Sequence, residues 1–146
     1  MLTKTEIWQE LSRGTDGDGL VITPIFCDEQ IGAGSVDVHL GHEFILFKRA
    51  SAAQFDINDD HSPLENLHRY QEKTRIGTGH KFILHPHQLV LGATIEFISL
   101  PCTLGARVSG RSTWGRTGLV IATATEIAPG FKGCVTLDRD IVKSCG

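Results

Sequence analysis

Two arginines, Arg111 and Arg116, and two hydroxyl side chains, Ser112 and Thr113, lie within six residues of a short segment framed by glycine, Gly110 to Gly118. The segment reads Gly-Arg-Ser-Thr-Trp-Gly-Arg-Thr-Gly and has an apolar, strand-like run on either side. Arginine can bind phosphate oxygens through two parallel hydrogen bonds, and glycine lets a backbone approach a ligand closely. The segment therefore indicates a turn that binds polyphosphate. A solvated β-turn that carries two arginines is the alternative, because short basic motifs are common.

A hydroxyl and a carboxylate lie two positions apart in a second segment, residues 133–140. Side chains alternate between the two faces of a strand, so Thr136 and Asp138 would share one face and could line one pocket. The alternative is an ordinary strand that ends in surface Asp138-Arg139-Asp140.

The sequence predicts no metal held by the protein. Zinc-dependent deaminases need His-x-Glu and Pro-Cys-x-x-Cys, but His42-Glu43 are adjacent and Pro101-Cys102 is not followed by the second cysteine. Residues 56–67 begin like a calcium loop but lack its glycine and its final glutamate, so we interpret them as a solvated acidic loop. We interpret His85-Pro86-His87 as a structural turn.

Composition limits the classes of function. A chain of 146 residues is most simply one domain, and its net charge of −3 argues against a general nucleic-acid binder. The N-terminus has no signal-like region, and no apolar run approaches the ~18 residues of a membrane span. We therefore expect a cytoplasmic protein with no membrane or nucleic-acid partner, whose four scattered cysteines are reduced thiols.

Most of the chain has the pattern of short strands separated by tight turns. The exception is a helix predicted over Leu2–Arg13, with Thr3 and Glu6 in a capping-box pattern. A second, short helix is predicted near Pro63–Tyr70, inside a polar segment from Lys48 to His80. The strands are predicted at Leu20–Ile25, Ser35–Gly41, Glu43–Phe47, Lys81–Leu84, Gln88–Leu91, Thr94–Ser99, Ala106–Ser109, Leu119–Thr125 and Cys134–Leu137.

Five blocks of sequence occur in an order that resembles the dCTP deaminase branch of the dUTPase superfamily. The blocks are Ser35-Val-Asp-Val-His-Leu-Gly, Phe82-Ile-Leu-His-Pro, Leu91-Gly-Ala-Thr-Ile-Glu, Gly110-Arg-Ser-Thr-Trp-Gly-Arg-Thr-Gly-Leu and Pro129-Gly-Phe-Lys-Gly-Cys-Val-Thr-Leu. The resemblance covers nearly the whole chain.

The resemblance implies a mainly β fold with a short N-terminal helix, a distorted β-barrel of the dUTPase/dCTP deaminase type. It also implies a homotrimer with active sites between subunits. The chain would form a single domain over residues 1–146, without the C-terminal strands and tail with which the family normally continues.

The implied reaction converts dCTP and water to dUTP and ammonia without zinc, with Mg2+ carried by the triphosphate. Ser112 and Arg116 would help position the attacking water, and the family's catalytic glutamate falls on Asp138. One carboxylate can act first as general base and then as general acid in such a reaction. The nucleotide-binding set carried over by position is Arg111, Ser112, Thr113, Trp114, Gly115, Arg116, Ala128, Thr136, Leu137 and Asp138.

Two departures from the family pattern bear on activity. Asp138 replaces glutamate, which shortens the reach of the carboxylate by about 1–1.5 Å, and a misplacement of ~1 Å can cost ~100-fold in rate. Ala128 stands in Ala-Pro-Gly where the family usually has Asp-Pro-Gly, so a carboxylate near the nucleotide is lost. A nucleotide-binding relative without turnover is therefore an alternative. A dUTP diphosphatase is a weaker one, because it relies on an aspartate near position 128.

Overall fold

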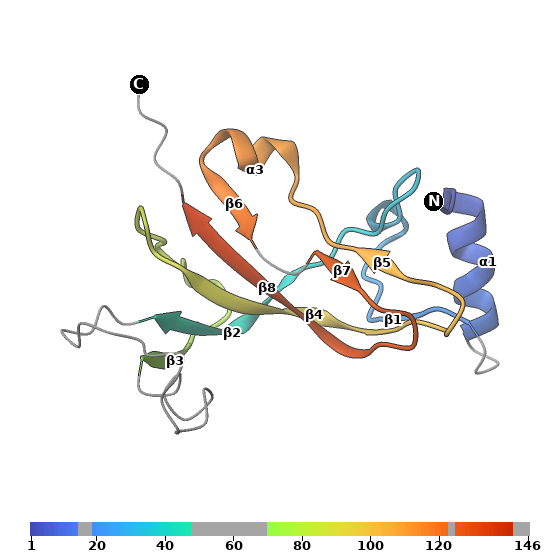
Figure 1. Ribbon diagram of the computed structural model, residues 1–146, viewed down its shortest axis with the longest axis horizontal. Coiled ribbons are helices and arrows are strands. Elements are labelled where there is room, and N and C mark those ends of the chain that lie inside the picture. Colours follow the sequence, from blue (N-terminus) through green and yellow to red (C-terminus); the bar gives the residue numbers. More distant parts are fainter. Residues whose placement is uncertain (15–18, 48–69, 123–124, 142–146) are drawn as a thin grey trace, which may run out of the picture.

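The computed structural model describes residues 1–14, 19–47, 70–122 and 125–141, with backbone alone at 122 and 138–141 (Figure 1). The helix predicted near Pro63–Tyr70 and the acidic loop at 56–67 lie outside these residues, except for Tyr70, which is in a turn. Within the described ranges no helix is long and apolar enough to cross a membrane. Cys27, Cys102 and Cys134 are free thiols, as expected.

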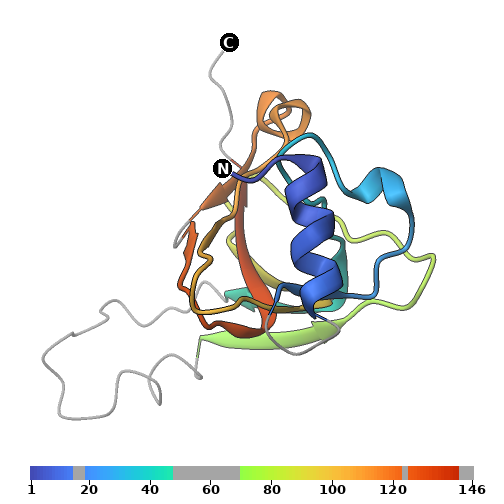
Figure 2. The ribbon, with the colours of Figure 1, turned by 90° about the vertical axis from the view of Figure 1, so that its right-hand side faces the viewer.

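The predicted N-terminal helix is confirmed as α1, Lys4–Gly14. Its capping box forms as the sequence indicates: the Thr3 backbone N–H and hydroxyl donate to Glu6 Oε2 at 2.7 and 2.8 Å, and the Glu6 N–H donates to Thr3 Oγ1 at 3.4 Å. These bonds from Thr3, the backbone bond first, lower the pKa of Glu6 below its ordinary value. The helix buries Ile7 and lies at the end of the molecule next to β1, Val21–Thr23 (Figures 1 and 2).

The strands are antiparallel and form a six-stranded and a two-stranded sheet. The larger sheet has the order β3-β2-β4-β8-β6, with β1 also paired to β4, and the smaller one joins β5 to β7. Seen along its long axis, the chain curves around an interior that α1 covers from one end (Figure 2). The remaining bounds are β2 Leu40–Phe47, β3 Gln71–Arg75, β4 Val90–Ser99, β5 Ala106–Arg107, β6 Leu119–Ala122, β7 Glu126–Ile127 and β8 Lys132–Ile141, with a short 3-10 helix, η1, at Asp28–Gln30.

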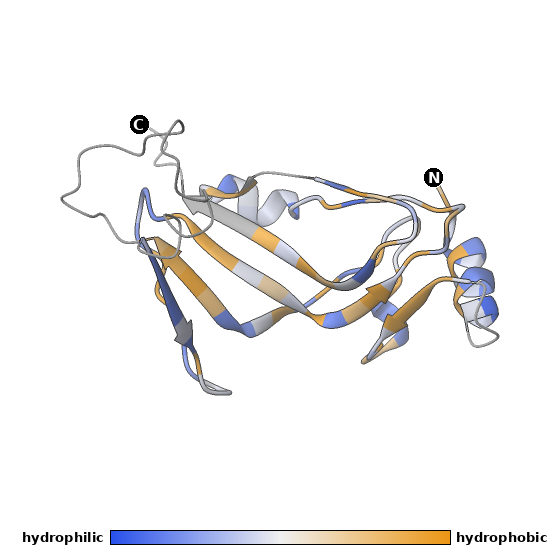
Figure 3. Ribbon diagram, turned by 60° about the horizontal axis from the view of Figure 1, so that its bottom comes forward, coloured by the Kyte–Doolittle hydropathy of each residue, from blue (hydrophilic) through white to orange (hydrophobic). Residues whose placement is uncertain are grey.

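The larger sheet has an inner face that carries the core and an outer face that is open. Burial alternates along β4 and β8, so Ile98, Val135 and Leu137 join Ile7 in the core. Apolar residues, coloured orange, recur along the strands of the larger sheet (Figure 3). Residues of the opposite phase on β4 are half-buried or exposed, and Phe97 is 41% exposed. The all-β fold class with a short N-terminal helix is therefore confirmed.

Several predicted strand boundaries are wrong. The predicted break at Gly92-Ala93 does not occur, and residues 90–99 form the single strand β4. The reason is packing, because a Cβ at Gly92 would lie 2.8 Å from Leu40 Cδ1 on the neighbouring strand. Glycine here permits close contact between strands and does not mark a turn.

Other errors lie outside the sheet centre. Residues 81–84 are not a strand, and of the predicted strand Ser35–Gly41 only residues 40 and 41 belong to one, namely β2. Val36 forms only an isolated bridge with Ile31. The short β7 and the polar strand β3 were not predicted. Among the described residues β3 pairs only with β2, and it lacks the apolar alternation that marks a half-buried strand.

Candidate functional site

The glycine-framed segment 110–118 forms a short helix, α3 at Ser112–Arg116, where the sequence predicted a turn. The backbone N–H groups of Trp114 and Gly115 donate to the carbonyl of Arg111 at 3.0 and 3.1 Å, which closes the first turn. The helix ends before Gly118, whose φ of 87° lies in the left-handed region that glycine adopts readily. The polar side chains of the segment are therefore carried by a short helix that lies directly before β6.

All five residues of α3 and the preceding Arg111 are exposed to solvent. Among the described residues, the Arg116 guanidinium makes no ion pair. A Cβ at Gly115 would meet no described atom within 4 Å, so there is open space beside the helix. The structure therefore leaves Ser112, Thr113 and Arg116 accessible to a ligand.

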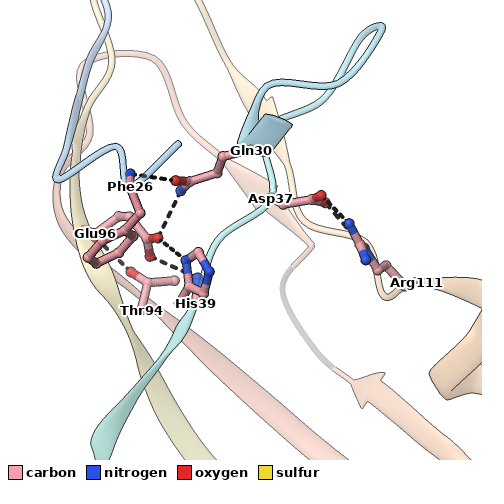
Figure 4. A network of polar contacts seen from close by, with 7 residues as sticks. All are labelled: Phe26, Gln30, Asp37, His39, Thr94, Glu96 and Arg111. Atoms are coloured by element: carbon pink, nitrogen blue, oxygen red, sulfur yellow. Dashed lines mark hydrogen bonds and ion pairs between the residues drawn. The ribbon is translucent and has the colours of Figure 1, made fainter. Parts of the chain in front are cut away.

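Arg111 is paired with Asp37, which the sequence reasoning did not place in the site. Its Nη2 donates to Asp37 Oδ2, and its Nε lies 3.4 Å from Asp37 Oδ1 (Figure 4). The two side chains are 68% and 42% exposed, so water reaches the pair. The contact occupies one edge of the guanidinium and leaves the Nη1 donors available for an anion.

Two cavities lie next to this helix. Arg111 and Asp37 help to line a cavity of about 560 Å³ that is otherwise largely apolar. A second cavity of about 300 Å³ is lined by Trp114, with Phe44 and Phe82 stacked on each other at 4.6 Å. The larger cavity contains Val135 and Leu137, so Arg111 lies on the inner side of the sheet.

The predicted residues of β8 have different environments. Thr136 is exposed, whereas Leu137 is 5% exposed and belongs to the lining of the larger cavity. The register pairs Asp138 with Leu91 on β4 and Ala122 on β6. Asp138 has the strand phase of Thr136, which is opposite to the phase of the core residue Leu137.

The segments carrying the predicted residues are apart within one chain. β6 pairs Leu119, just after α3, with Ile141, so the Asp138 backbone lies roughly 10 Å further along β8 at ~3.3 Å per residue. Ala128 follows β7 and lies by Gly105, at the far end of the segment that leads to Arg111. The structure thus gathers the α3 residues, but it does not bring Ala128 to them.

A buried polar cluster lies beside Asp37 on the inner face (Figure 4). Glu96 is fully buried, and its carboxylate accepts from Gln30 Nε2 at 2.9 Å and from the His39 backbone N–H at 2.9 Å. His39 Nδ1 lies 2.7 Å from Glu96 Oε1. We call Gln30, His39 and Glu96 the Glu96 network. Within the described residues no cluster of three His, Cys, Asp or Glu groups is arranged to hold a metal ion.

Comparison with known proteins decides the family. The family model described as dCTP deaminase-like matches residues 1–140. The chain belongs to the dCTP deaminase-like family. It is similar to proteins named "dCTP deaminase, dUMP-forming" from Methanobrevibacter smithii, with 38% identity over 82% of this chain, and from Dictyoglomus thermophilum, with 45% identity over 82%.

The chain spans 60% of the length of both relatives. A protein named dCTP deaminase from Haloarcula marismortui is 39% identical over 94% of this chain and 68% of its own. The crystal structure of 2'-deoxycytidine 5'-triphosphate deaminase from Agrobacterium tumefaciens superposes with a TM-score of 0.66 at 19% identity. It covers 97% of this chain and 41% of that chain. This last likeness establishes the dCTP deaminase fold for the chain.

The residues that sequence reasoning missed in this dCTP deaminase-like chain are Asp37 and the Glu96 network. Asp37 carried no signal of its own, because its contact with Arg111 is made only after folding. Glu96 did carry one: it shares the inward phase of Val90 and Ile98 along β4. A charged residue at a core position needs partners, so this signal could have singled out Glu96, but it does not indicate which residues the partners are.

Proposed function

We propose that this dCTP deaminase-like protein catalyses the hydrolytic deamination of dCTP to dUTP and ammonia. The proposal rests on one observation: α3 and the residue before it expose Arg111, Ser112, Thr113 and Arg116 to solvent, with Arg111 paired to Asp37. Two guanidinium groups and two hydroxyls on one short element suit a triphosphate. Because the chain belongs to the dCTP deaminase-like family, we infer that this triphosphate is part of a pyrimidine nucleotide.

In the proposed reaction Arg111 and Arg116 bind the triphosphate, and this binding energy fixes the base in place. Asp138 takes a proton from a water molecule as its oxygen bonds to C4 of cytosine. The same carboxyl group passes this proton to the ring nitrogen. It then takes the proton of the new C4 hydroxyl and passes it to the amino group, so that the bond from C4 to the amino nitrogen breaks, the C4 carbonyl forms and ammonia leaves. Ser112 and Arg116 hold the water, and Trp114, Gly115, Thr136 and Leu137 complete the nucleotide contacts.

We assign Mg2+ to the substrate, since a triphosphate carries this ion into such sites. The proposal requires no metal held by the protein alone.

We further propose that the protein acts as a homotrimer with each site between two copies. The supporting observation is the outer face of the sheet, where Ile95, Phe97 and Val120 are 38%, 41% and 42% exposed. Apolar groups gathered on one open face favour association. Arg111 lies on the inner side and Thr136 has the outer phase, so a second copy is needed to unite the two halves of the site.

Some relatives are named dUMP-forming, which makes removal of pyrophosphate a second candidate step. Ala128 offers no carboxylate for it, so we propose dUTP as the product. A relative that binds nucleotide without turnover is the remaining alternative, and a dUTP diphosphatase is a weaker one for the same reason at Ala128.

The experiment incubates the purified protein with dCTP and Mg2+ and separates dUTP from dUMP while ammonia is measured. We expect ammonia and dUTP in equal amounts. Asp138→Asn should lower the rate at least ~100-fold and retain dCTP binding, because one general acid–base is typically worth 10²–10⁴-fold. Asp140→Asn, a matched change nearby on β8, should leave the rate within about twofold. dCTP binding without ammonia would establish the non-catalytic alternative.

A further inference from the structure

We propose that the Glu96 network is a positioning unit that fixes Asp37 and, through Asp37, the phosphate-binding edge of Arg111. The nucleotide part of this inference rests on the proposed function, but the positioning part does not. Gln30, His39 and Glu96 touch no predicted ligand contact directly, so they act through another residue.

The network has a buried centre, Glu96 and Gln30, and a half-exposed member, His39. Glu96 and Gln30 are 0% and 3% exposed, and a buried carboxylate is tolerated only where donors replace water. The Glu96 carboxylate accepts from the His39 backbone N–H and from the Gln30 amide, and its Oε1 lies 2.7 Å from His39 Nδ1. The Gln30 amide oxygen in turn accepts from the Phe26 N–H at 3.0 Å. The cluster therefore defines one conformation for each member.

Asp37 lies between two anchors that belong to this cluster. Its backbone N–H donates to the Gln30 carbonyl at 2.8 Å, and the carbonyl of His39, two positions later, accepts from Ile95 N–H at 2.9 Å. Residues 37–39 are not in a strand, so no continuous ladder holds them. The network supplies the restraint that a ladder would supply elsewhere.

The side chains of this segment point in two directions. His39 points toward Glu96, and Asp37 points away from it toward Arg111 (Figure 4). Fixing His39 thus fixes the backbone from which the Asp37 carboxylate reaches the guanidinium. A restrained carboxylate holds Arg111 on one edge and presents Nη1 outward.

This restraint matters because an arginine side chain loses rotamer entropy when it is immobilised. If Arg111 is already oriented before the ligand arrives, less of this entropy is lost on binding. A substitution that disrupts the network should therefore make Arg111 more mobile and weaken its binding of a triphosphate, even though the substituted residue lies away from the ligand.

The test measures the motion of Arg111 by 15N relaxation of its Nε–H group, assigned by its loss in Arg111→Lys. In the unchanged protein we expect an order parameter near the rigid value of about 0.85. In Glu96→Gln and His39→Gln it should fall below about 0.6. The control is Glu29→Gln, an exposed glutamate next to Gln30, which should leave the value unchanged.

His39→Gln keeps the test decisive if Glu96→Gln fails to fold, because the His39 side chain is 51% exposed and its backbone bond to Glu96 survives. An unchanged order parameter in folded His39→Gln would overturn the inference. So would a mobile Arg111 in the unchanged protein, because there would be nothing to position.

A second measurement follows dCTP binding by calorimetry. His39→Gln should weaken binding about three- to tenfold, and it should add nothing to Asp37→Asn, because both changes release the same guanidinium. Additive effects would contradict action through Asp37. A protein that binds no dCTP but shows the predicted change in Arg111 motion would refute the proposed function and support the positioning unit.

Discussion

The guanidinium of Arg111 is paired with the carboxylate of Asp37, a residue 74 positions earlier in the sequence. The pair joins the segment before β2 to the helix that carries the other candidate phosphate ligands. An exposed ion pair of this kind contributes little to stability, typically ~0–1 kcal/mol. We infer that the pair acts mainly by orienting the Arg111 side chain.

Arg111→Lys should weaken dCTP binding by about tenfold. Lysine keeps the charge but loses the planar fork that can pair with Asp37 and phosphate together. Calorimetry with dCTP and Mg2+ measures the change. Arg107→Lys on the neighbouring strand β5 is the matched control and should bind as tightly as the unchanged protein. Equal affinity of Arg111→Lys would show that the fork plays no part.

Asp138→Glu should raise the rate of ammonia release, by up to ~100-fold if reach alone limits the present residue. The longer side chain restores the methylene by which Asp138 is shorter than the family's glutamate. Initial rates at saturating dCTP are the measurement. A lower rate with unchanged dCTP affinity would show that the surroundings of position 138 are adapted to aspartate.

Thr94→Val should destabilise the fold by about 1–3 kcal/mol. The β4–β8 register shifts between Ala93 and Phe97, and there the Thr94 hydroxyl accepts from Val135 N–H at 2.9 Å and donates to the Glu96 carbonyl at 2.8 Å. Valine has nearly the same shape but leaves this buried N–H unpaired. Urea unfolding measures the loss, and Thr5→Val on the exposed side of α1 is the control. Equal stability of the two variants would contradict this role.

The capping box should make stability depend on acid through Glu6. The hydrogen bonds from Thr3 lower the pKa of Glu6 in the folded state, so the stabilisation is present above the unfolded value and is lost as the pH falls through the folded one. Glu6→Gln should therefore lose less stability than the unchanged protein between about pH 6 and pH 3. NMR titration of the Glu6 carboxyl tests the cause, and a titration midpoint above 4.5 would refute it.

Phe97→Glu should prevent self-association. Phe97 is 41% exposed on the outer face of the sheet, and a charge there would have to be buried between copies. Sedimentation equilibrium should find a trimer for the unchanged protein and monomers for the variant. Ile83→Glu, a change at an apolar side chain that is 71% exposed outside the strands, should remain a trimer. A trimeric Phe97→Glu would place the interface elsewhere.

The sequence was informative wherever local chemistry or alternation decides the structure. The Thr3–Glu6 capping box formed as predicted, and the alternation of Val135 and Leu137 with exposed neighbours located β8. Gly92 misled the prediction, because a glycine that permits contact with Leu40 and a glycine that permits a turn look the same in a sequence.

The polar relationships could not be predicted in the same way. The bond between Gln30 and Glu96 spans 66 positions, and the contact of Asp37 with Arg111 spans 74. Such pairs depend on which strands become neighbours, and no local pattern contains that information. The role of Asp138 as acid and base rests on the family resemblance and stays a prediction.

The proposed deamination is tested most directly by following the oxygen of water into the product. The purified protein is supplied with dCTP and Mg2+ in water enriched in 18O, and the nucleotide product is examined by mass spectrometry while ammonia is measured. We expect dUTP that carries one 18O atom in its base, with one ammonia released for each molecule formed. Unchanged dCTP, with no ammonia and no label in the base, would contradict the proposed deamination.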